Sequence, residues 1–246
     1  LFPPYANGQA TSHSYLNRNK QSIALDLKDA ENIELIKSKI SEFDIVVEQF
    51  RPGVMKRLGL DYPTLAEINP RLIYCSITGY GQTGVYKNKA GHDINYLALS
   101  GVAGQSGRKQ SGPPPMGIQI ADVAGGSLHA IIAILTAVIE RQHSGKGQYI
   151  DISMTDCSAV LNSMAAAATL AGKKPQYREE GLLNGGAFYD YYQTQDARYL
   201  SIGSLEPQFM SGLASILDLP VLLQLGNSFH QADQHLLKQA IQEKIS

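Results

Sequence analysis

The sequence predicts an α/β protein with an open parallel sheet, followed by part of a smaller α+β domain. Short β-branched, apolar runs bounded by turn residues alternate with segments of helical periodicity, and this alternation is typical of a parallel sheet covered by helices. The chain has 246 residues, of which 43% are hydrophobic, so it can bury a substantial core.

Four segments have the composition of buried strands. They are residues 22–27 (SIALDL), 43–48 (FDIVVE), 71–78 (RLIYCSIT) and 148–154 (QYIDISM). The segment after the first strand, 28–41, predicts a helix. Its Ile33, Leu35, Ile36 and Ile40 fall mostly on one face, as the helical period requires.

The longest predicted helix covers residues 122–143. It begins with Asp122, where the helix dipole favours an acidic residue, and it ends before Gly145, a common residue type after the last helical turn. Because it is largely apolar, we expect it to pack deep in the domain. A further helical run follows at 155–171.

Residues 172–186 are polar, contain several glycines and indicate a linker. We place a domain boundary there, with a large domain at 1–180 and a small domain at 181–246. Residues 188–203 alternate aromatic and polar side chains, as an antiparallel hairpin does. Two predicted helices complete the chain, at 206–219 and 231–245.

Charge and cysteine usage exclude several classes of protein. The 21 Lys and Arg balance 22 Asp and Glu, so no overall field attracts nucleic acid. Cys75 and Cys157 have neither C-x-x-C nor zinc spacing, which favours a reducing, cytoplasmic compartment and no structural metal. The longest apolar stretch, 131–139, is about half of a membrane span, and the N-terminus lacks a signal-peptide pattern. We therefore expect no membrane or nucleic-acid partner.

Gly79, Gly81 and Gly84 have the spacing G-x-G-x-x-G of a dinucleotide site and follow a predicted strand. They do not lead into a helix, and no acidic residue ends a second strand about 20 residues later, as that motif requires. The glycines instead predict a loop at the carboxyl end of a strand, where open α/β sheets bind ligands.

His92 and Asp93 stand where a helix is predicted to begin. Asp93 could be an ordinary N-cap, with His92 a surface residue. The same geometry also suits chemistry, because free backbone N–H groups at a helix start stabilise an oxyanion and an imidazole can transfer protons near neutral pH.

Two more carboxylates allow a structural and a chemical interpretation. Asp122 could cap the long helix, or it could be a group whose pKa is raised by its apolar surroundings, with Gly125, Gly126 and Ser127 leaving room for a ligand. Glu206 precedes a proline and could be a first-turn helix acid.

Several motifs in order resemble the family III CoA-transferases and, within them, the α-methylacyl-CoA racemases. These motifs are NRNKQSIALDLK, FRPGVMKRLGLDY, RLIYCSITGYGQTG, AGHDINYLALSG, ADVAGG, RQHSGKGQYIDISM and GSLEPQF. The resemblance runs nearly end to end. GHDINY followed by LEPQF favours the racemase branch, because the transferases keep the aspartate of ADVAGG but generally lack the His-Asp pair.

The resemblance implies a role for each catalytic candidate. His92 and Asp122 would be the acid/base groups on opposite sides of the substrate's α-carbon. Asp93 would present its backbone N–H to the thioester oxygen, and Glu206 would orient or tune His92. No metal or redox cofactor would be needed, and CoA would be part of the substrate.

The resemblance also implies a Rossmann-like large domain that binds the CoA thioester. Arg18, Arg51 and Arg57 are candidates for the CoA phosphates, and Tyr96 and Gly91 for the pantetheine path. Family members begin with one more strand and helix, extend beyond residue 246 and form interlocked homodimers. We therefore expect this chain to be a fragment, with a second copy as its partner.

Three functions remain open at this point. The first is racemisation of 2-methylacyl-CoA thioesters through an enolate. The second is CoA transfer with Asp122 as a nucleophile that forms an aspartyl-CoA thioester. The third is a CoA-binding fragment without catalytic activity.

Overall fold

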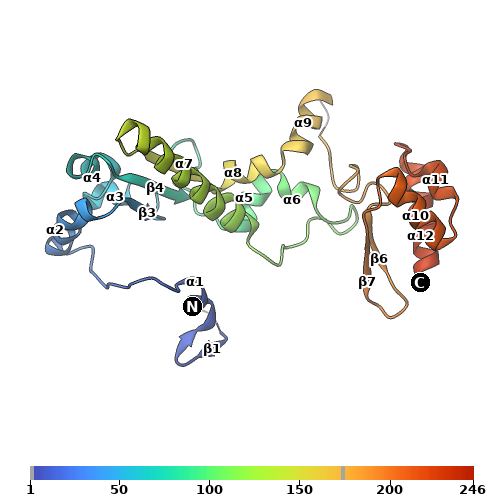
Figure 1. Ribbon diagram of the computed structural model, residues 1–246, viewed down its shortest axis with the longest axis horizontal. Helices are drawn as coiled ribbons and strands as arrows, with labels where there is room; N and C mark the ends of the chain where they lie inside the picture. Colours follow the sequence, from blue (N-terminus) through green and yellow to red (C-terminus); the bar gives the residue numbers. More distant parts are fainter. Residues whose placement is uncertain (1–2, 173–174) are drawn as a thin grey trace.

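The computed structural model describes residues 3–172 and 175–246 (Figure 1). The chain is elongated. A parallel sheet lies towards one end of its longest axis, and a C-terminal module of helices and a hairpin lies at the other. Between them lie, among others, the helices α5 (Asp93–Leu99), α6 (Val102–Gln105) and α8 (Met154–Leu161).

The sheet has three parallel strands in the order β3 (Ile45–Glu48), β4 (Ile73–Thr78) and β5 (Tyr149–Ser153). Ile45 pairs with Ile73, and Tyr74 pairs with Tyr149. Three of the four predicted strands and their parallel arrangement are therefore confirmed.

The two faces of β4 pack against different helices, because neighbouring side chains of a strand point to opposite faces. Tyr74 faces an apolar cluster with residues of α2 (Ala30–Lys39), the 3₁₀-helix η1 (Ile40–Glu42) and α4 (Tyr62–Ile68). The short α3 (Val54–Leu58) contributes Met55 and Leu58 to the edge of this cluster.

On the other face of β4, Cys75 packs against Ala130 of α7 (His129–Ser144) and Ile152 of β5. The central strand is therefore buried between two layers of helices. Cys75 itself is fully buried, and burial raises the pKa of its thiol to about 11.

The predicted long helix is present, but its first two turns have a different form. Residues Ala121–Leu128 form a π-helix, η2, which continues into α7. The helix ends before Gly145, whose φ of 73° is left-handed, as the sequence predicted. Single π-helical turns are uncommon and occur often at functional sites.

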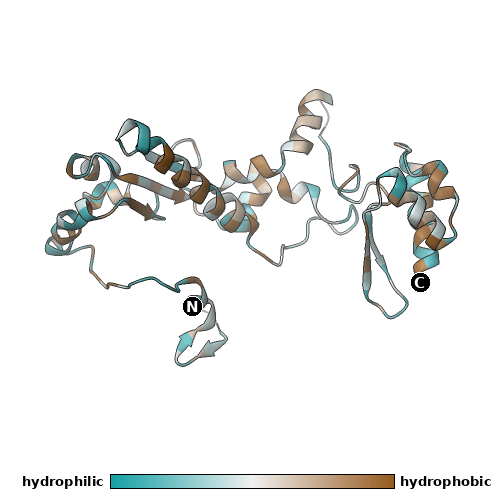
Figure 2. Cartoon of the chain, in the orientation of Figure 1, coloured by the Kyte–Doolittle hydropathy of each residue, from teal (hydrophilic) through white to brown (hydrophobic). Residues whose placement is uncertain are grey.

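The prediction that this helix packs deep in the domain is wrong. Its outer face is apolar and 52–61% exposed at Ile131, Ile132, Leu135 and Ile139, and Figure 2 shows this hydrophobic run along α7. The span Ala121–Ser144, with a mean hydropathy of 1.8 in its apolar window, is long and apolar enough to cross a membrane. One such helix is weak evidence, since core helices share this composition. Composition alone does not determine how many faces of a helix pack against other elements.

The predicted strand at 22–27 is also wrong. Residues 21–26 have no regular secondary structure, and Ile23 is 75% exposed. A strand needs a neighbour for its backbone N–H and C=O groups, and β3, the edge strand, pairs with β4 alone. Before this segment lie a short hairpin and a helix, β1 (Tyr5–Ala6), β2 (Gln9–Ala10) and α1 (Thr11–Leu16), away from the sheet (Figure 1).

The predicted helix at 155–171 is split at Asn162 into α8 and α9 (Ser163–Gly172). Residues 173 and 174 of the predicted linker lie outside the described residues. The antiparallel hairpin is confirmed, as β6 (Asp190–Gln193) and β7 (Tyr199–Ile202).

Three helices follow the hairpin, α10 (Pro207–Leu217), α11 (Val221–Leu225) and α12 (Gln231–Ile245). They share with it an apolar cluster whose buried members all lie between Phe188 and Ile241. The C-terminal module therefore has a core of its own. The domain boundary at residue 180 stays a prediction.

Candidate active site

His92 and Asp93 stand at the start of α5. His92 is the residue before the first helical one, and its backbone N–H donates to Oδ1 of Asn95 at 3.0 Å. Asp93 is the first helical residue, so the simple interpretation of Asp93 as the N-cap of this helix is wrong. Its carboxylate has another partner.

That partner is the second helix start of the site. Oδ1 of Asp93 accepts the backbone N–H of Asp122, in the first turn of η2, at 3.0 Å. Because the first N–H groups of a helix have no intrahelical acceptor, a carboxylate there is stabilising. This hydrogen bond joins the starts of α5 and η2 and brings His92 and Asp122 into one region.

Tyr96 holds the peptide before His92. Its hydroxyl donates to the carbonyl of Gly91 at 2.6 Å, and its ring is buried. The ring fills the space that side chains at two glycines would need: a Cβ at Gly79 would lie 2.4 Å from it, and a Cβ at Gly91 2.7 Å. Gly79 is thus needed for close packing, in agreement with a glycine loop that shapes a pocket.

Asp122 has a raised pKa. Burial is the largest cause, and the nearby negative charge of Asp93 adds to it, whereas His92 opposes it. Burial disfavours a charged carboxylate, so the protonated form persists to higher pH than in a free aspartate. The sequence-based expectation of a raised pKa beside an apolar helix is confirmed.

His92 and Asp122 line one cavity at the carboxyl end of β4, which we call the strand-end cavity. Its wall comes from the segment after β3, the end of β4, the loop 79–91 and the starts of α5, η2 and α8. Ligands of open α/β sheets bind at this end of the strands. The two residues therefore lie together, although 30 positions separate them in the sequence.

His92 and Asp122 also line a second cavity, which we call the apolar cavity. Its other lining residues are mostly hydrophobic: Ile94, Leu97, Ala98, Ala103, Pro113, Pro114, Pro115 and Met116, with Asp93 and Gln119. The imidazole and the carboxyl group thus stand where a mixed polar cavity and an apolar cavity meet.

The predicted CoA-binding residues are only partly brought together. Arg51, Tyr96 and Gly91 line the strand-end cavity. Arg57 lies on α3 and does not line it, and Arg18 stacks over the ring of Tyr15 in the N-terminal segment, away from the sheet (Figure 1).

Two cations of the cavity were missed by the sequence reasoning. Lys87 and Lys89, in the loop 79–91, line the strand-end cavity together with Arg51. The signal was the basic stretch YKNK directly after the glycine loop. These three cations could hold the phosphates of a ligand that enters from this side.

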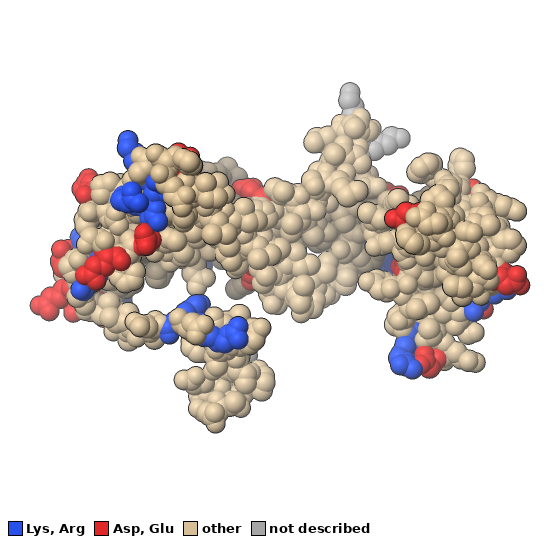
Figure 3. Space-filling model, viewed as in Figure 1, with Lys and Arg blue, Asp and Glu red and all other residues tan. Residues whose placement is uncertain are grey.

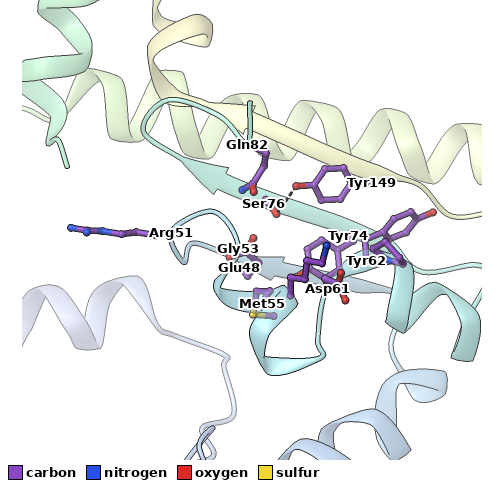
Figure 4. Close-up of a pocket in the computed structure, with 12 residues that line it drawn as sticks. Glu48, Arg51, Gly53, Met55, Asp61, Tyr62, Tyr74, Ser76, Gln82 and Tyr149 are labelled. Atoms are coloured by element: carbon purple, nitrogen blue, oxygen red, sulfur yellow. Dashed lines mark hydrogen bonds between the residues drawn. The ribbon is translucent and has the colours of Figure 1, made fainter. Parts of the chain in front are cut away.

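A neighbouring cavity at β3 and β4 contains the rings of Tyr62, Tyr74 and Tyr149 (Figure 4). Tyr149 donates to Oγ of Ser76 at 3.1 Å, and Arg51 extends away from the other labelled side chains. The rings contact one another at centroid distances of 5.7–6.1 Å. Arg51 therefore borders both this aromatic cavity and the strand-end cavity.

The structure does not bring Glu206 to His92 within this chain. Glu206 is the N-cap of α10 in the C-terminal module, and Figure 1 shows that module well separated from α5. Glu206 lines neither of the two cavities that contain His92. As for metal sites, residues 3–172 and 175–246 contain no group of three or more His, Cys, Asp or Glu placed to hold an ion.

A family model described as CoA-transferase family III matches residues 1–246. The chain belongs to this family. Among solved structures, a CAIB/BAIF family protein from Brucella suis has a TM-score of 0.80 and 32% sequence identity, over 98% of this chain and 65% of that protein. Its likeness agrees with the α/β fold and the parallel sheet.

Curated relatives include both branches of the family. The chain is 42% identical to α-methylacyl-CoA racemase of Mus musculus over 85% of its length and 55% of the mouse protein. It is 36% identical to succinyl-CoA:glutarate CoA-transferase of Homo sapiens over 90% of its length and 50% of the human protein. The chain therefore spans about half the length of these relatives.

Proposed function

We propose that this chain carries the acid/base pair of a racemase that acts on 2-methylacyl-CoA thioesters. The observation that supports this most is the position of His92 and Asp122, which line the same two cavities. The name of the mouse relative, at 42% identity, favours the same reaction. The proposal makes this an isomerase within a family that also includes transferases.

In this mechanism, one group removes the α-proton and the other returns a proton to the opposite face. Two groups are needed because one confined base tends to give the proton back to the face from which it took it. The raised pKa of Asp122 suits this role, because an acid/base group works best when its pKa lies near the operating pH.

The negative charge that develops on the thioester oxygen needs a donor already in place. The first N–H groups of α5 have no intrahelical acceptor, and we assign the N–H of Asp93 to this task. Because its side chain is bonded to the N–H of Asp122, Asp93 would hold the oxyanion donor and the acid/base pair in one frame.

The two cavities suit the two ends of an acyl-CoA. Arg51, Lys87 and Lys89 provide positive charge for the CoA phosphates in the strand-end cavity, and the apolar cavity accepts the branched acyl chain. We keep the homodimer as part of the proposal, with Glu206 reaching His92 from a second copy, since one chain keeps these residues apart.

Exchange of the α-proton tests this function. Incubation of a 2-methylacyl-CoA in deuterium oxide should replace the α-proton with deuterium, as followed by NMR, and His92→Ala and Asp122→Ala should each slow exchange by roughly 10²–10⁴-fold. Exchange that continues at the wild-type rate in Asp122→Ala would overturn the assignment.

CoA transfer is the second candidate, favoured by the transferase relatives at 33–38% identity. The carboxylate of Asp122 would attack the thioester carbonyl, release the CoA thiolate and form a mixed anhydride. The thiolate would then attack the aspartyl carbonyl, which forms the aspartyl-CoA thioester and releases the donor acid as its carboxylate. Trapping with hydroxylamine or borohydride during turnover separates the candidates, because a covalent adduct on Asp122 contradicts racemisation. If the chain binds CoA but shows neither α-proton exchange nor a covalent adduct on Asp122, the remaining function is a CoA-binding fragment without catalytic activity.

A further inference from the structure

One buried hydroxyl of the strand-end cavity has no partner. Thr78 is the last residue of β4 and is 7% exposed, and within the described residues its Oγ1 forms no hydrogen bond. Thr78 lines the same cavity as His92 and Asp122. A buried polar group without a partner is destabilising, so its retention calls for an explanation.

The neighbouring hydroxyls at the strand ends are all bonded. Oγ of Ser76 accepts from Tyr149 at 3.1 Å, Oγ of Ser153 accepts from the N–H of Asp156 at 3.2 Å, and Oγ1 of Thr155 donates to the carbonyl of Gly79 at 2.7 Å. The fold thus supplies partners to hydroxyls all around Thr78. Thr78 is the one of these four residues whose hydroxyl has no partner, although the residue lines the cavity.

We propose that Thr78 binds the substrate, by donating a hydrogen bond from its hydroxyl to a carbonyl oxygen of the bound acyl-CoA. This proposal rests on the proposed acyl-CoA substrate and adds a contact that fixes where its thioester end lies. Oγ1 is shielded from solvent in the structure, so the bond requires a rotation about χ1 that exchanges Oγ1 with the methyl group. The gain of a partner offsets the cost of that rotation.

A second unpaired hydroxyl provides a matched control. Oγ of Ser158 in α8 is fully buried and also has no partner among the described residues. It packs where a Cβ at Gly125 would lie, at 2.5 Å, and lines neither cavity of the site. Ser158 therefore has the same unsatisfied hydroxyl as Thr78 without access to a ligand.

The test compares Thr78→Val, Thr78→Ser and Ser158→Ala in binding of CoA and of 2-methyldecanoyl-CoA by calorimetry. We expect Thr78→Val to raise the Kd for the acyl-CoA about tenfold, with Thr78→Ser and Ser158→Ala within about twofold of wild type. Thr78→Val and Ser158→Ala should both unfold at the wild-type temperature or above, since each removes an unsatisfied hydroxyl.

The measurement with free CoA identifies the acceptor of the hydrogen bond. If Thr78→Val loses the same affinity for CoA as for the acyl-CoA, the acceptor is a pantetheine amide. If it loses affinity for the acyl-CoA alone, the acceptor is the thioester carbonyl. Wild-type affinity of Thr78→Val for both ligands, or an equal loss in Ser158→Ala, would overturn the proposal. If Thr78→Val does not fold, the Kd values of Thr78→Ala and Thr78→Ser for the acyl-CoA are compared instead, and the proposal requires the higher Kd in Thr78→Ala. A loss of affinity in Thr78→Val without any α-proton exchange in wild type would support Thr78 while contradicting the racemase.

Discussion

Two partly buried aspartates, Asp122 at the candidate site and Asp190 in the C-terminal module, have opposite electrostatic surroundings. Burial alone would raise the pKa of Asp190, but hydrogen bonds from Arg108, Lys238 and the N–H of Tyr191 overcome this and lower it. Arg108 binds both carboxylate oxygens, at 2.6 and 2.8 Å, and Lys238 donates at 2.7 Å. This aspartate is fully paired.

Asp122 is partly buried and has no such compensation. Burial raises its pKa, its nearest acidic neighbour Asp93 raises it further, and His92 only partly opposes them. On the face shown in Figure 3, the charged side chains gather towards the two ends of the molecule and few lie over its middle. One carboxylate is thus arranged to hold two parts of the chain together, and the other is left able to exchange a proton.

The strongest test of this difference is stability. Asp190→Asn should lower the free energy of unfolding by about 1–3 kcal/mol, because it removes the carboxylate that Arg108 and Lys238 share, and both cations are partly exposed. Asp122→Asn should leave it unchanged or raise it, because it removes a charge that burial disfavours. Urea denaturation of both variants measures this. An equal loss in Asp122→Asn would show that both carboxylates are structural.

A second test concerns packing at the site. Gly79→Ala should cost about 1–3 kcal/mol, since its Cβ would overlap the Tyr96 ring, and it should lower kcat/KM about tenfold or more as the ring and the adjoining Gly91 move. Gly104→Ala in α6 is the control, because a Cβ there meets nothing within 4 Å. Normal activity of Gly79→Ala would mean that the loop adapts without loss.

The elements that could be predicted are those fixed by local sequence. The strand 73–78 is a near-continuous apolar run, the helix Gln231–Ile245 has the predicted bounds, and the hairpin alternates aromatic and polar residues. In each case the signal lies within the segment itself. Residues 22–27 carried the same signal but lack a neighbouring strand, which no local pattern reveals.

The site was predicted in its residue types better than in its contacts. The residues of GHD and the aspartate of ADVAGG do lie together, but the bond from Asp122 N–H to Asp93 spans 29 positions and the π-helical form of η2 has no distinct sequence signal. Thr78 could not be identified either, because it is an ordinary strand residue until its missing partner is seen. Glu206 shows the converse, since its expected role needs a contact that one chain does not make.

A third test uses two tyrosines with matched hydrogen bonds. Tyr96 donates to the carbonyl of Gly91 at 2.6 Å, and Tyr192 in the C-terminal module donates to the carbonyl of Phe188 at 2.6 Å. Replacing either with Phe should cost about 0.5–1.5 kcal/mol of stability. Only Tyr96→Phe should lower kcat, by about tenfold, with a smaller change in KM, because it loosens the peptide before His92. An equal fall in kcat for Tyr192→Phe would assign the effect to general destabilisation.

The smallest effect, and the most direct one on the two carboxylates, is the pH dependence of stability. The pKa of Asp122 is raised in the folded state, so relative to Asp122→Asn the wild type should lose stability as the pH rises from the unfolded pKa, about 3.9, through the folded pKa. The pKa of Asp190 is lowered, so its stabilisation should be present above about 3.9 and disappear as the pH falls through the lower folded pKa. As the pH rises through this acidic range, the unfolding free energy of wild type should therefore fall relative to Asp122→Asn and rise relative to Asp190→Asn. Differences of the same sign would mean that the two aspartates are held in the same way, and the distinction between a paired and an exchanging carboxylate would fail.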